Sequence, residues 1–443
     1  MSAREKQAPF EISHRSVFLL AVPMTLAYIS TPLLGLVDTA VVGQFGDAAL
    51  IGGLAIGAVI IDLVFTTFNF LRGGTTGLVA QALGAGDERE KQAVFFRAMA
   101  IAIVSGVVLA VASPLILSLG LWFMAPGADV AEATSTYFLI RMLSTPFALG
   151  NYVILGWLLG IGRSGLTLAV QLILNGTNIV LSIVLGLWLG WQVEGVALAT
   201  LAGELLAFVV GLGVCWRLAD PTARPSLAQI RETNAWKRLT NLNADIMIRS
   251  FALLFAFAWF TAEGAGFGEV TLAANAVLMH FFFIGAYFLD GMATAAEQII
   301  GRCVGARYRE GFWKGFRLTL FWNTILSMAS ALAFFLAGHA LINLMSTSQE
   351  VREAAYLFMP WAALMPVTGM LAFQLDGVFI GATWSRDMTV MMLVSLAVYL
   401  LVWQLVEDPL GNHGLWLSLH AFVVCRGITL AFRLAPRARM TFG

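Results

Sequence analysis

The sequence has 443 residues, of which 59% are hydrophobic and only 12% are charged, and its formal net charge is zero. A soluble protein of this length cannot bury so much apolar surface. The composition therefore excludes a water-soluble globular protein and is typical of a membrane protein with many spans.

Apolar stretches long enough to cross a bilayer follow one another along the whole chain. A helix needs about 20 apolar residues to cross ~30 Å of hydrocarbon, whereas the strands of a β-barrel would be short alternating segments. We therefore predict an all-α polytopic protein with twelve transmembrane helices, the first of which is too long to be a signal peptide. The predicted spans are residues 16–42, 48–72, 93–119, 135–160, 165–190, 193–217, 244–262, 270–300, 313–337, 353–382, 387–406 and 413–434.

Basic residues are concentrated on alternate loops. The odd-numbered loops carry almost no lysine or arginine, Arg352 being the exception, while the even-numbered loops and both termini are basic. Because basic loops stay on the cytoplasmic side, both termini are predicted to be cytoplasmic, as an even number of helices also requires. The basic residues are Arg4, Lys6, Arg15, Arg89, Lys91, Arg97, Arg163, Arg217, Arg224, Arg231, Lys237, Arg238, Arg302, Arg307, Arg309, Lys314, Arg317, Arg386, Arg433, Arg437 and Arg439.

The two halves of the chain resemble each other weakly. Residues 84–97 (GAGDEREKQAVFFR) resemble residues 305–317, and GWLLG at 156–160 matches GVFIG at 377–381 with the same separation along the chain. Composition alone can make two six-helix bundles look alike, but the equal separations favour a duplication. We predict an N-lobe at residues 1–218 (helices 1–6), a cytoplasmic linker at 219–240 and a C-lobe at 241–443 (helices 7–12), related by an axis along the membrane normal.

Sequence motifs for catalysis or cofactor binding are missing. The chain has no nucleotide phosphate loop, no H-E-x-x-H and no G-x-S-x-G, and its three cysteines show no metal or disulfide spacing. We expect no enzyme activity, no cofactor and no metal. Uphill transport would then depend on an ion gradient and on ionisable side chains.

Asp38 is the only charged residue in the apolar run from residue 17 to residue 42, and the only acid that we place deep in the first half with a bendable helix around it. A charge at membrane depth costs at least ~2.5–3.5 kcal/mol, so a functional role is the first hypothesis for Asp38. Burial disfavours the charged form of a carboxyl group, so Asp38 could bind and release a proton. A structural aspartate paired permanently with polar helices is the alternative. Pro23, Pro32 and Gly35 make this helix bendable.

Small polar residues on the fifth and sixth predicted helices could reach Asp38. Asn178 and Ser182 are four residues apart, which places them on one helix face, and Thr200 lies on the next helix. These side chains could complete a hydrogen-bonded network with Asp38. They could equally hold helices together, as small polar residues often do in membranes.

The second half carries a different set of charges. Asp245 and Arg249 are four residues apart on the seventh predicted helix, and Asp376 lies in the tenth. Arg249, the only basic residue that we place deep in a helix, cannot lose its charge. It should hold Asp376 or Asp245 ionised, as a structural pair or a gate. Glu297, near the cytoplasmic end of the eighth helix, should meet only headgroups or Arg302.

The chain resembles the MATE (multidrug and toxic compound extrusion) family, and within it the DinF branch. The resemblance rests on motifs spread over nearly the whole chain: PLLGLVDTAVVG (32–43), FLRGGTTGLVAQALGAG (70–86), NADIMIRS (243–250), LDGMATAAEQIIGRCVGAR (289–307) and LDGVFIGAT (375–383). It implies an antiporter that exports amphipathic, often cationic or aromatic, compounds. It also implies a V-shaped fold of two six-helix lobes that rock between inward- and outward-facing states.

The resemblance also implies roles for individual residues. Proton coupling would fall to Asp38, in a network with Asn178 and Thr200. Ser182 departs from the family pattern, because relatives commonly carry an aspartate there, and this puts the number of coupled ions in doubt. Asp376 matches an acid that sodium-coupled relatives use, but Arg249 stands where such relatives tend to carry an acid, and its charge would repel Na⁺.

We therefore expect a monomeric, proton-coupled efflux carrier in the bacterial cytoplasmic (inner) membrane. Its partners would be a small-molecule substrate, protons rather than Na⁺, and the lipid bilayer, without nucleic acid. The alternatives are a Na⁺-coupled multidrug antiporter and a lipid-linked precursor flippase. Flippases of that kind often add two further helices and a strongly basic central cavity.

Overall fold

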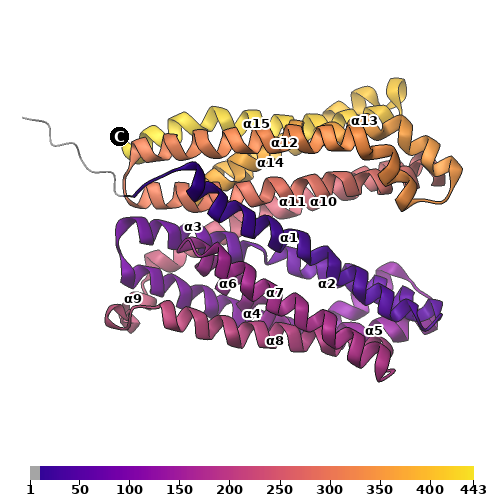
Figure 1. The fold of residues 1–443 in the computed structure, drawn as a ribbon, viewed down its shortest axis with the longest axis horizontal. Coiled ribbons are helices and arrows are strands. Elements are labelled where there is room, and N and C mark those ends of the chain that lie inside the picture. Colours follow the sequence, from indigo (N-terminus) through magenta and orange to yellow (C-terminus); the bar gives the residue numbers. More distant parts are fainter. Residues whose placement is uncertain (1–9) are drawn as a thin grey trace, which may run out of the picture. The chain divides into compact units, whose positions relative to one another are not determined.

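The computed structural model describes residues 10–443, so Arg4 and Lys6 of the basic N-terminal segment lie outside the described part (Figure 1). The described chain is helical almost throughout. Its helices are α1 (His14–Gly43), α2 (Ala48–Thr67), α3 (Phe70–Ala85), α4 (Glu88–Met124), α5 (Ala128–Met142), α6 (Thr145–Gly160), α7 (Ser164–Leu181), η1 (Ser182–Trp188), α8 (Gln192–Leu218), η2 (Pro221–Ala223), α9 (Leu227–Ile230), α10 (Thr233–Gly266), α11 (Glu269–Gly305), α12 (Arg309–Met345), α13 (Gln349–Gly381), α14 (Ser385–Leu410) and α15 (Asn412–Phe442).

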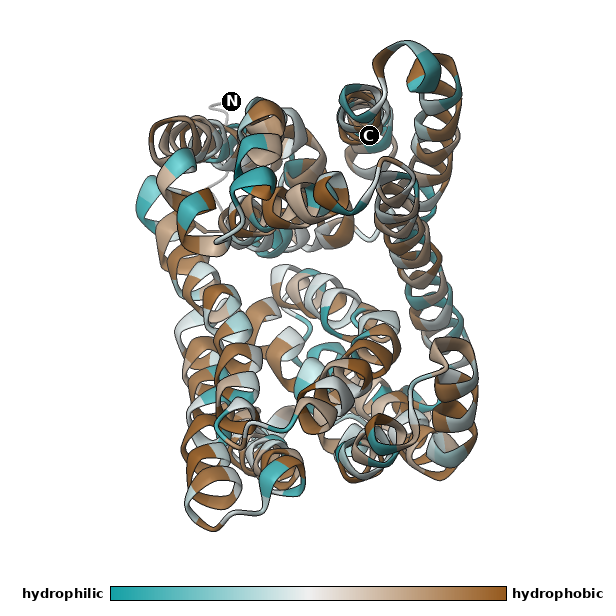
Figure 2. Cartoon of the chain, turned by 90° about the vertical axis from the view of Figure 1, so that its right-hand side faces the viewer, coloured by the Kyte–Doolittle hydropathy of each residue, from teal (hydrophilic) through white to brown (hydrophobic). Residues whose placement is uncertain are grey.

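The helices have the length and composition of transmembrane segments. Within residues 10–443, eleven are long and apolar enough to cross a membrane, or twelve if α5 and α6, which are bent by 51° at a short break, form one span. Hydrophobic residues make up much of the helices (Figure 2), and many large ones are exposed, as expected for helices that face lipid. The prediction of an all-α membrane protein with twelve spans is confirmed.

The described chain divides into two compact units. One, here called the N-unit, contains Leu26–Asn243, and the other, the C-unit, contains the described residues up to Thr25 together with Ala244–Gly443. Both divisions fall inside continuous helices, α1 and α10, rather than in loops. Residues 219–243 pack with the N-unit, and the first part of α1 packs with the C-unit.

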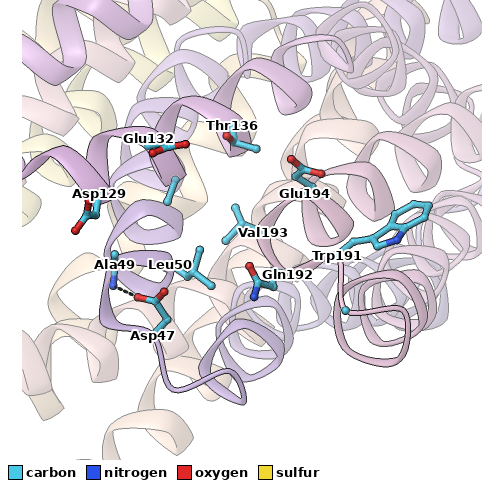
Figure 3. Close-up of a pocket in the computed structure, with 12 residues that line it drawn as sticks. Asp47, Ala49, Leu50, Asp129, Glu132, Thr136, Trp191, Gln192, Val193 and Glu194 are labelled. Atoms are coloured by element: carbon cyan, nitrogen blue, oxygen red, sulfur yellow. Dashed lines mark hydrogen bonds between the residues drawn. The ribbon is translucent and has the colours of Figure 1, made fainter.

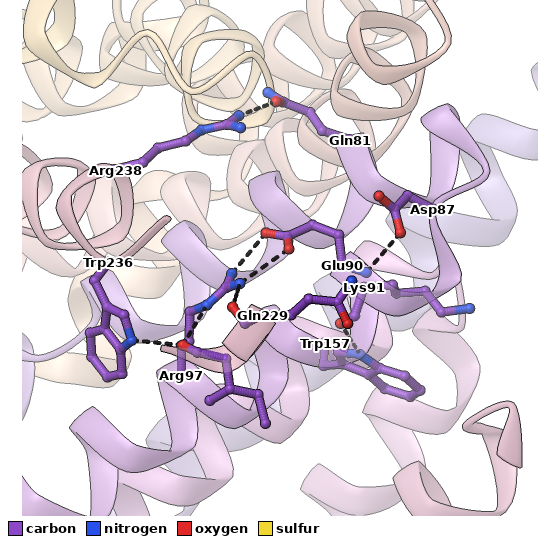
Figure 4. Close-up of polar contacts among 10 residues, drawn as sticks. Gln81, Asp87, Glu90, Lys91, Arg97, Trp157, Gln229, Trp236 and Arg238 are labelled. Atoms are coloured by element: carbon purple, nitrogen blue, oxygen red, sulfur yellow. Dashed lines mark hydrogen bonds and ion pairs between the residues drawn. The ribbon is translucent and has the colours of Figure 1, made fainter. Parts of the chain in front are cut away.

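The segment between α8 and α10 is bound firmly to the N-unit (Figure 4). Its helix α9 has only four residues and is too short to be stable alone. Arg97 of α4, which is 1% exposed, donates to the backbone oxygens of Gln229 (2.7 Å) and Ile230 (3.2 Å). The same guanidinium pairs with Glu90 at 2.8 Å, and the ring N–H of Trp236 also donates to the Ile230 oxygen. These bonds fix α9 on α4.

In the C-unit, α13 packs against α11, α12 and α15. Gly377 and Gly381, four residues apart on α13, allow the closest approach. A Cβ atom at either position would overlap the backbone oxygen of Ala293 or Glu297 on α11. Small residues at this spacing let helix backbones come together in membranes.

The replacement Gly377→Leu should therefore lower the stability of the protein, because the new side chain collides with the backbone of α11. Overpacking of this kind costs about 1–3 kcal/mol. The measurement is the thermal unfolding midpoint in detergent. Gly213→Leu is the control, since a Cβ at Gly213 meets nothing within 4 Å. Equal melting of the two variants would show that the α11–α13 contact is looser than described.

Candidate functional site

The part of α1 in the N-unit is tied to α7 and to the helix that follows it. The Ser182 hydroxyl donates to Asp38 Oδ1 at 2.8 Å, and Asn175 Nδ2 donates to the Ser30 hydroxyl at 2.7 Å. Asp38 is 7% exposed and Ser182 is fully buried. The Asp38 carboxylate is thus removed from bulk water but is bonded to a neutral hydroxyl.

A change in helix type places Ser182 beside Asp38. At Ser182, α7 widens into the π-helix η1, a rare form that often occurs at functional sites. Gly195 of α8 packs directly on η1, and a Cβ there would lie 2.6 Å from the Gly186 nitrogen. The contact holds η1 between α7 and α8 and fixes the position of its first residue.

The other two predicted network residues form a neighbouring pair. Asn178 Nδ2 donates to the Thr200 hydroxyl at 2.6 Å, one helical turn from Ser182. Asn178 is fully buried, and its Oδ1 atom has no hydrogen-bond partner among the described residues. The structure therefore brings together all four predicted residues, as two bonded pairs on adjoining turns.

The three predicted bending residues lie within α1, which is continuous from His14 to Gly43 (Figure 1). Pro23 is close to the point at which α1 passes from the C-unit to the N-unit. Pro32 and Gly35 are exposed, and a Cβ at Gly35 would meet nothing within 4 Å. The helix around Pro32 and Gly35 therefore has space in which to change its direction.

The carboxylate of Asp376 in the C-unit lies between two guanidinium groups. Arg249 Nη1 is 2.8 Å from Asp376 Oδ2, and Arg426 of α15 contacts the same oxygen. The Asp376, Arg249 and Arg426 side chains are 12%, 14% and 4% exposed. Asp245 is not the partner of Arg249 but accepts a hydrogen bond from Ser385 at 2.7 Å. Of the two predicted partners for Arg249, the structure selects Asp376.

One prediction about this unit is wrong, and one of two alternatives for Glu297 is excluded. Arg249 is not the only basic residue deep in a helix, because Arg426 is buried near the middle of α15. Glu297 does not face headgroups, because it is 5% exposed and its backbone lies against Gly381 of α13, whereas its contact with Arg302 stays a prediction. The close glycine contact between α11 and α13 encloses Glu297 within the unit.

A second acid lies deep in the first half. Glu204 lies near the middle of α8 and is half-buried, and its Oε2 atom accepts a hydrogen bond from Asn151 Nδ2 at 2.7 Å. Arg141 of α5 is 9% exposed and donates to the Ser144 hydroxyl at 3.2 Å. Glu204, Arg141 and Arg426 are isolated charges in apolar spans, the same signal that marked Asp38.

Two hollows lie away from these charged clusters. A cavity of about 510 Å³ at one end of the N-unit is lined by four acids, Asp47, Asp129, Glu132 and Glu194, together with Trp191 (Figure 3). A smaller one of about 240 Å³ in the C-unit is lined by Phe257, Phe260, Met279, His280 and Phe283. Within residues 10–443, no three His, Cys, Asp or Glu side chains converge as metal ligands would.

The chain is similar to known proteins over nearly its whole length. The family model described as MatE matches residues 23–184 and 246–404. The DNA damage-inducible protein F of Escherichia coli is 35% identical, over 95% of this chain and 91% of that protein. The probable multidrug resistance protein NorM of Caulobacter vibrioides is 24% identical, over 94% and 90%. The fold matches a crystal structure of MATE in the bent conformation, with a TM-score of 0.88 at 17% identity over 96% of both chains.

The replacement Asp376→Asn should destabilise the protein strongly, because it leaves two buried guanidinium groups without a counter-charge. Removing one partner of a buried ion pair costs about 3–5 kcal/mol. Thermal or denaturant unfolding in detergent measures the loss. Asp408→Asn is the control, since Asp408 is exposed on α14. If Asp376→Asn and the control have the same unfolding midpoint, the two arginines do not need this carboxylate for the stability of the protein.

Proposed function

Because the chain belongs to the MATE family of multidrug efflux transporters, we propose that it is a secondary antiporter that exports amphipathic cationic or aromatic compounds in exchange for protons. It is a multi-pass membrane protein. We place it in the bacterial inner membrane as a monomer with both termini in the cytoplasm, as the distribution of basic loops favours.

The observation that carries this proposal is the buried bond between Asp38 and Ser182. An ionised carboxylate only accepts hydrogen bonds, whereas a protonated one also carries an O–H donor. A proton on Asp38 would therefore change its bonding to Ser182. The bare Oδ1 atom of Asn178, one turn away, could accept a bond in the protonated state.

Helix α1 offers a route from this proton site to the rest of the molecule. Its residues from Leu26 onward belong to the N-unit, and those up to Thr25 belong to the C-unit. Pro23, Pro32 and Gly35 weaken the helix against bending. A change in bonding at Asp38 would thus act on a helix that both units share, which alternating access requires. Outside, protonation would release the substrate, and inside, deprotonation would reset the carrier.

The charges favour protons over Na⁺. A sodium ion takes oxygen ligands and is stabilised by carboxylates, but Asp376 is already held by Arg249 and Arg426. Asp38 is accompanied by the neutral side chains of Ser182, Asn178 and Thr200. A site of this kind can bind a proton without further negative charge.

Purified protein in liposomes should move an ethidium-like dye against its gradient when a pH difference is imposed. The replacement Asp38→Asn should reduce this proton-driven transport at least tenfold, because an amide of the same shape cannot titrate. Fluorescence of the dye reports its movement. Unchanged unfolding midpoints would show that Asp38→Asn still folds.

Asp408→Asn serves as the matched control, because it makes the same substitution at an exposed acid. Undiminished dye export by Asp38→Asn would show that Asp38 is not the proton-coupling site. Transport driven by a Na⁺ gradient at equal pH would favour the sodium-coupled alternative. Movement of lipid-linked precursors without dye transport would favour the flippase.

A further inference from the structure

We propose that Glu204 is a second coupled proton site of the N-unit, which gains and loses a proton while hydrogen-bonded to the side-chain amide of Asn151. This inference rests on the proposed antiport function and deepens it. It assigns to the N-unit two titrating carboxylates, Asp38 and Glu204, in place of one.

The contact between Glu204 and Asn151 is specific and sheltered. Asn151 Nδ2 donates to Glu204 Oε2 at 2.7 Å and to the Glu204 backbone oxygen at 3.0 Å. Asn151 is 2% exposed, and its Oδ1 atom is buried without a hydrogen-bond partner among the described residues. Glu204 itself is half-buried in the middle of α8.

This arrangement suits both protonation states of the glutamate. The ionised carboxylate accepts the bond from Nδ2, as in the structure. A protonated carboxyl group has an O–H donor, and the bare Oδ1 of the same amide is an acceptor for it. A glutamate with a purely structural role would need only the Nδ2 donor of Asn151. The Asn151 Oδ1 atom, which accepts no hydrogen bond, is therefore the observation that points to proton exchange.

The charged groups around Glu204 are of both signs. Helix α8 packs against α7, η1, α6 and α5, with weaker contact to α2. Neither α7 nor η1 carries a charged side chain, while α6 supplies the phenol of Tyr152. Arg141 of α5 attracts the Glu204 carboxylate but donates its own hydrogen bond to Ser144. The charges of Arg72 and Asp62 also act near Tyr152.

The buried acid of the C-unit has partners of a different kind. Asp376 lies between two guanidinium groups, which would hold it ionised throughout a transport cycle. Glu204 is bonded to a neutral amide, and so is free to gain a proton and to lose it. The difference lies in the type of partner, since both carboxylates sit in transmembrane helices.

Glu204 also continues the polar line that begins at Asp38. Thr200 and Glu204 are four residues apart on α8, which places them on the same face about 6 Å apart along the axis. Thr200 is bonded to Asn178, and Asn178 lies one turn from Ser182, which is bonded to Asp38. The two carboxylates therefore stand at the ends of one row of polar side chains.

The test is the number of protons exchanged per substrate. With the membrane potential set to zero in liposomes, each coupled proton contributes about a tenfold dye gradient per pH unit at equilibrium. The wild-type protein should therefore reach about a hundredfold gradient per pH unit. Glu204→Gln, which keeps an oxygen to accept from Asn151, should reach only about tenfold, and Glu204→Asp should restore the steeper dependence.

A second readout separates proton exchange from a structural role. Asn151→Leu removes both groups of the amide and should shift the pH at which transport is half-maximal. The shift should vanish when Asn151→Leu is combined with Glu204→Gln, because no titrating group is then left at this position.

The outcomes distinguish this inference from the function on which it rests. A wild-type gradient of only tenfold per pH unit, or a Glu204→Gln variant that keeps the hundredfold gradient, would overturn the second proton site while leaving the antiporter intact. If Glu204→Gln fails to fold, a tenfold wild-type gradient still overturns the second site, and an unchanged pH dependence of Asn151→Leu overturns its assignment to Glu204. Absence of any pH-driven gradient in the wild-type protein would contradict the antiport function itself.

Discussion

A charged side chain at membrane depth must find its partner within the protein, because hydrocarbon offers none. The helix contacts of this chain follow from that constraint. The π-helix η1 brings Ser182 to Asp38, α15 brings Arg426 to Asp376, and α6 brings Asn151 to Glu204. Each partner lies far along the sequence, so the ionisable groups help to determine which helix faces meet.

The chemistry of these partners separates the two units. The carboxylate of Asp376 is held between positive charges, whereas Asp38 and Glu204 are bonded to neutral groups. A carboxylate between two guanidinium groups keeps its charge, and one bonded to a hydroxyl or an amide can exchange a proton. The weak repeat in the sequence therefore need not mean equal roles. We propose that ion coupling falls to the N-unit, whereas the C-unit carries a fixed ion cluster.

Hydropathy and motifs alone predicted the helices and the family and singled out Asp38 as a candidate, because apolar length and isolated charges can be read along a single chain. The pairings could not be read in this way. Arg426 was visible as an isolated charge, but its contact with Asp376 depends on how α13 and α15 face each other. The π-turn at Ser182 and the change of unit inside α1 depend likewise on packing. Glu204 carries the same signal as Asp38, an isolated charge in an apolar span, but its bond to Asn151 depends on the packing of α6 on α8.

If Asp38 couples transport to protons, substrate and proton compete through its carboxylate. The most direct measurement is the proton release when a cationic dye binds to purified protein in weakly buffered detergent solution. We expect the wild-type protein to release protons on binding, and Asp38→Asn to release fewer while still binding the dye. Equal proton release by the two proteins would contradict this role of Asp38.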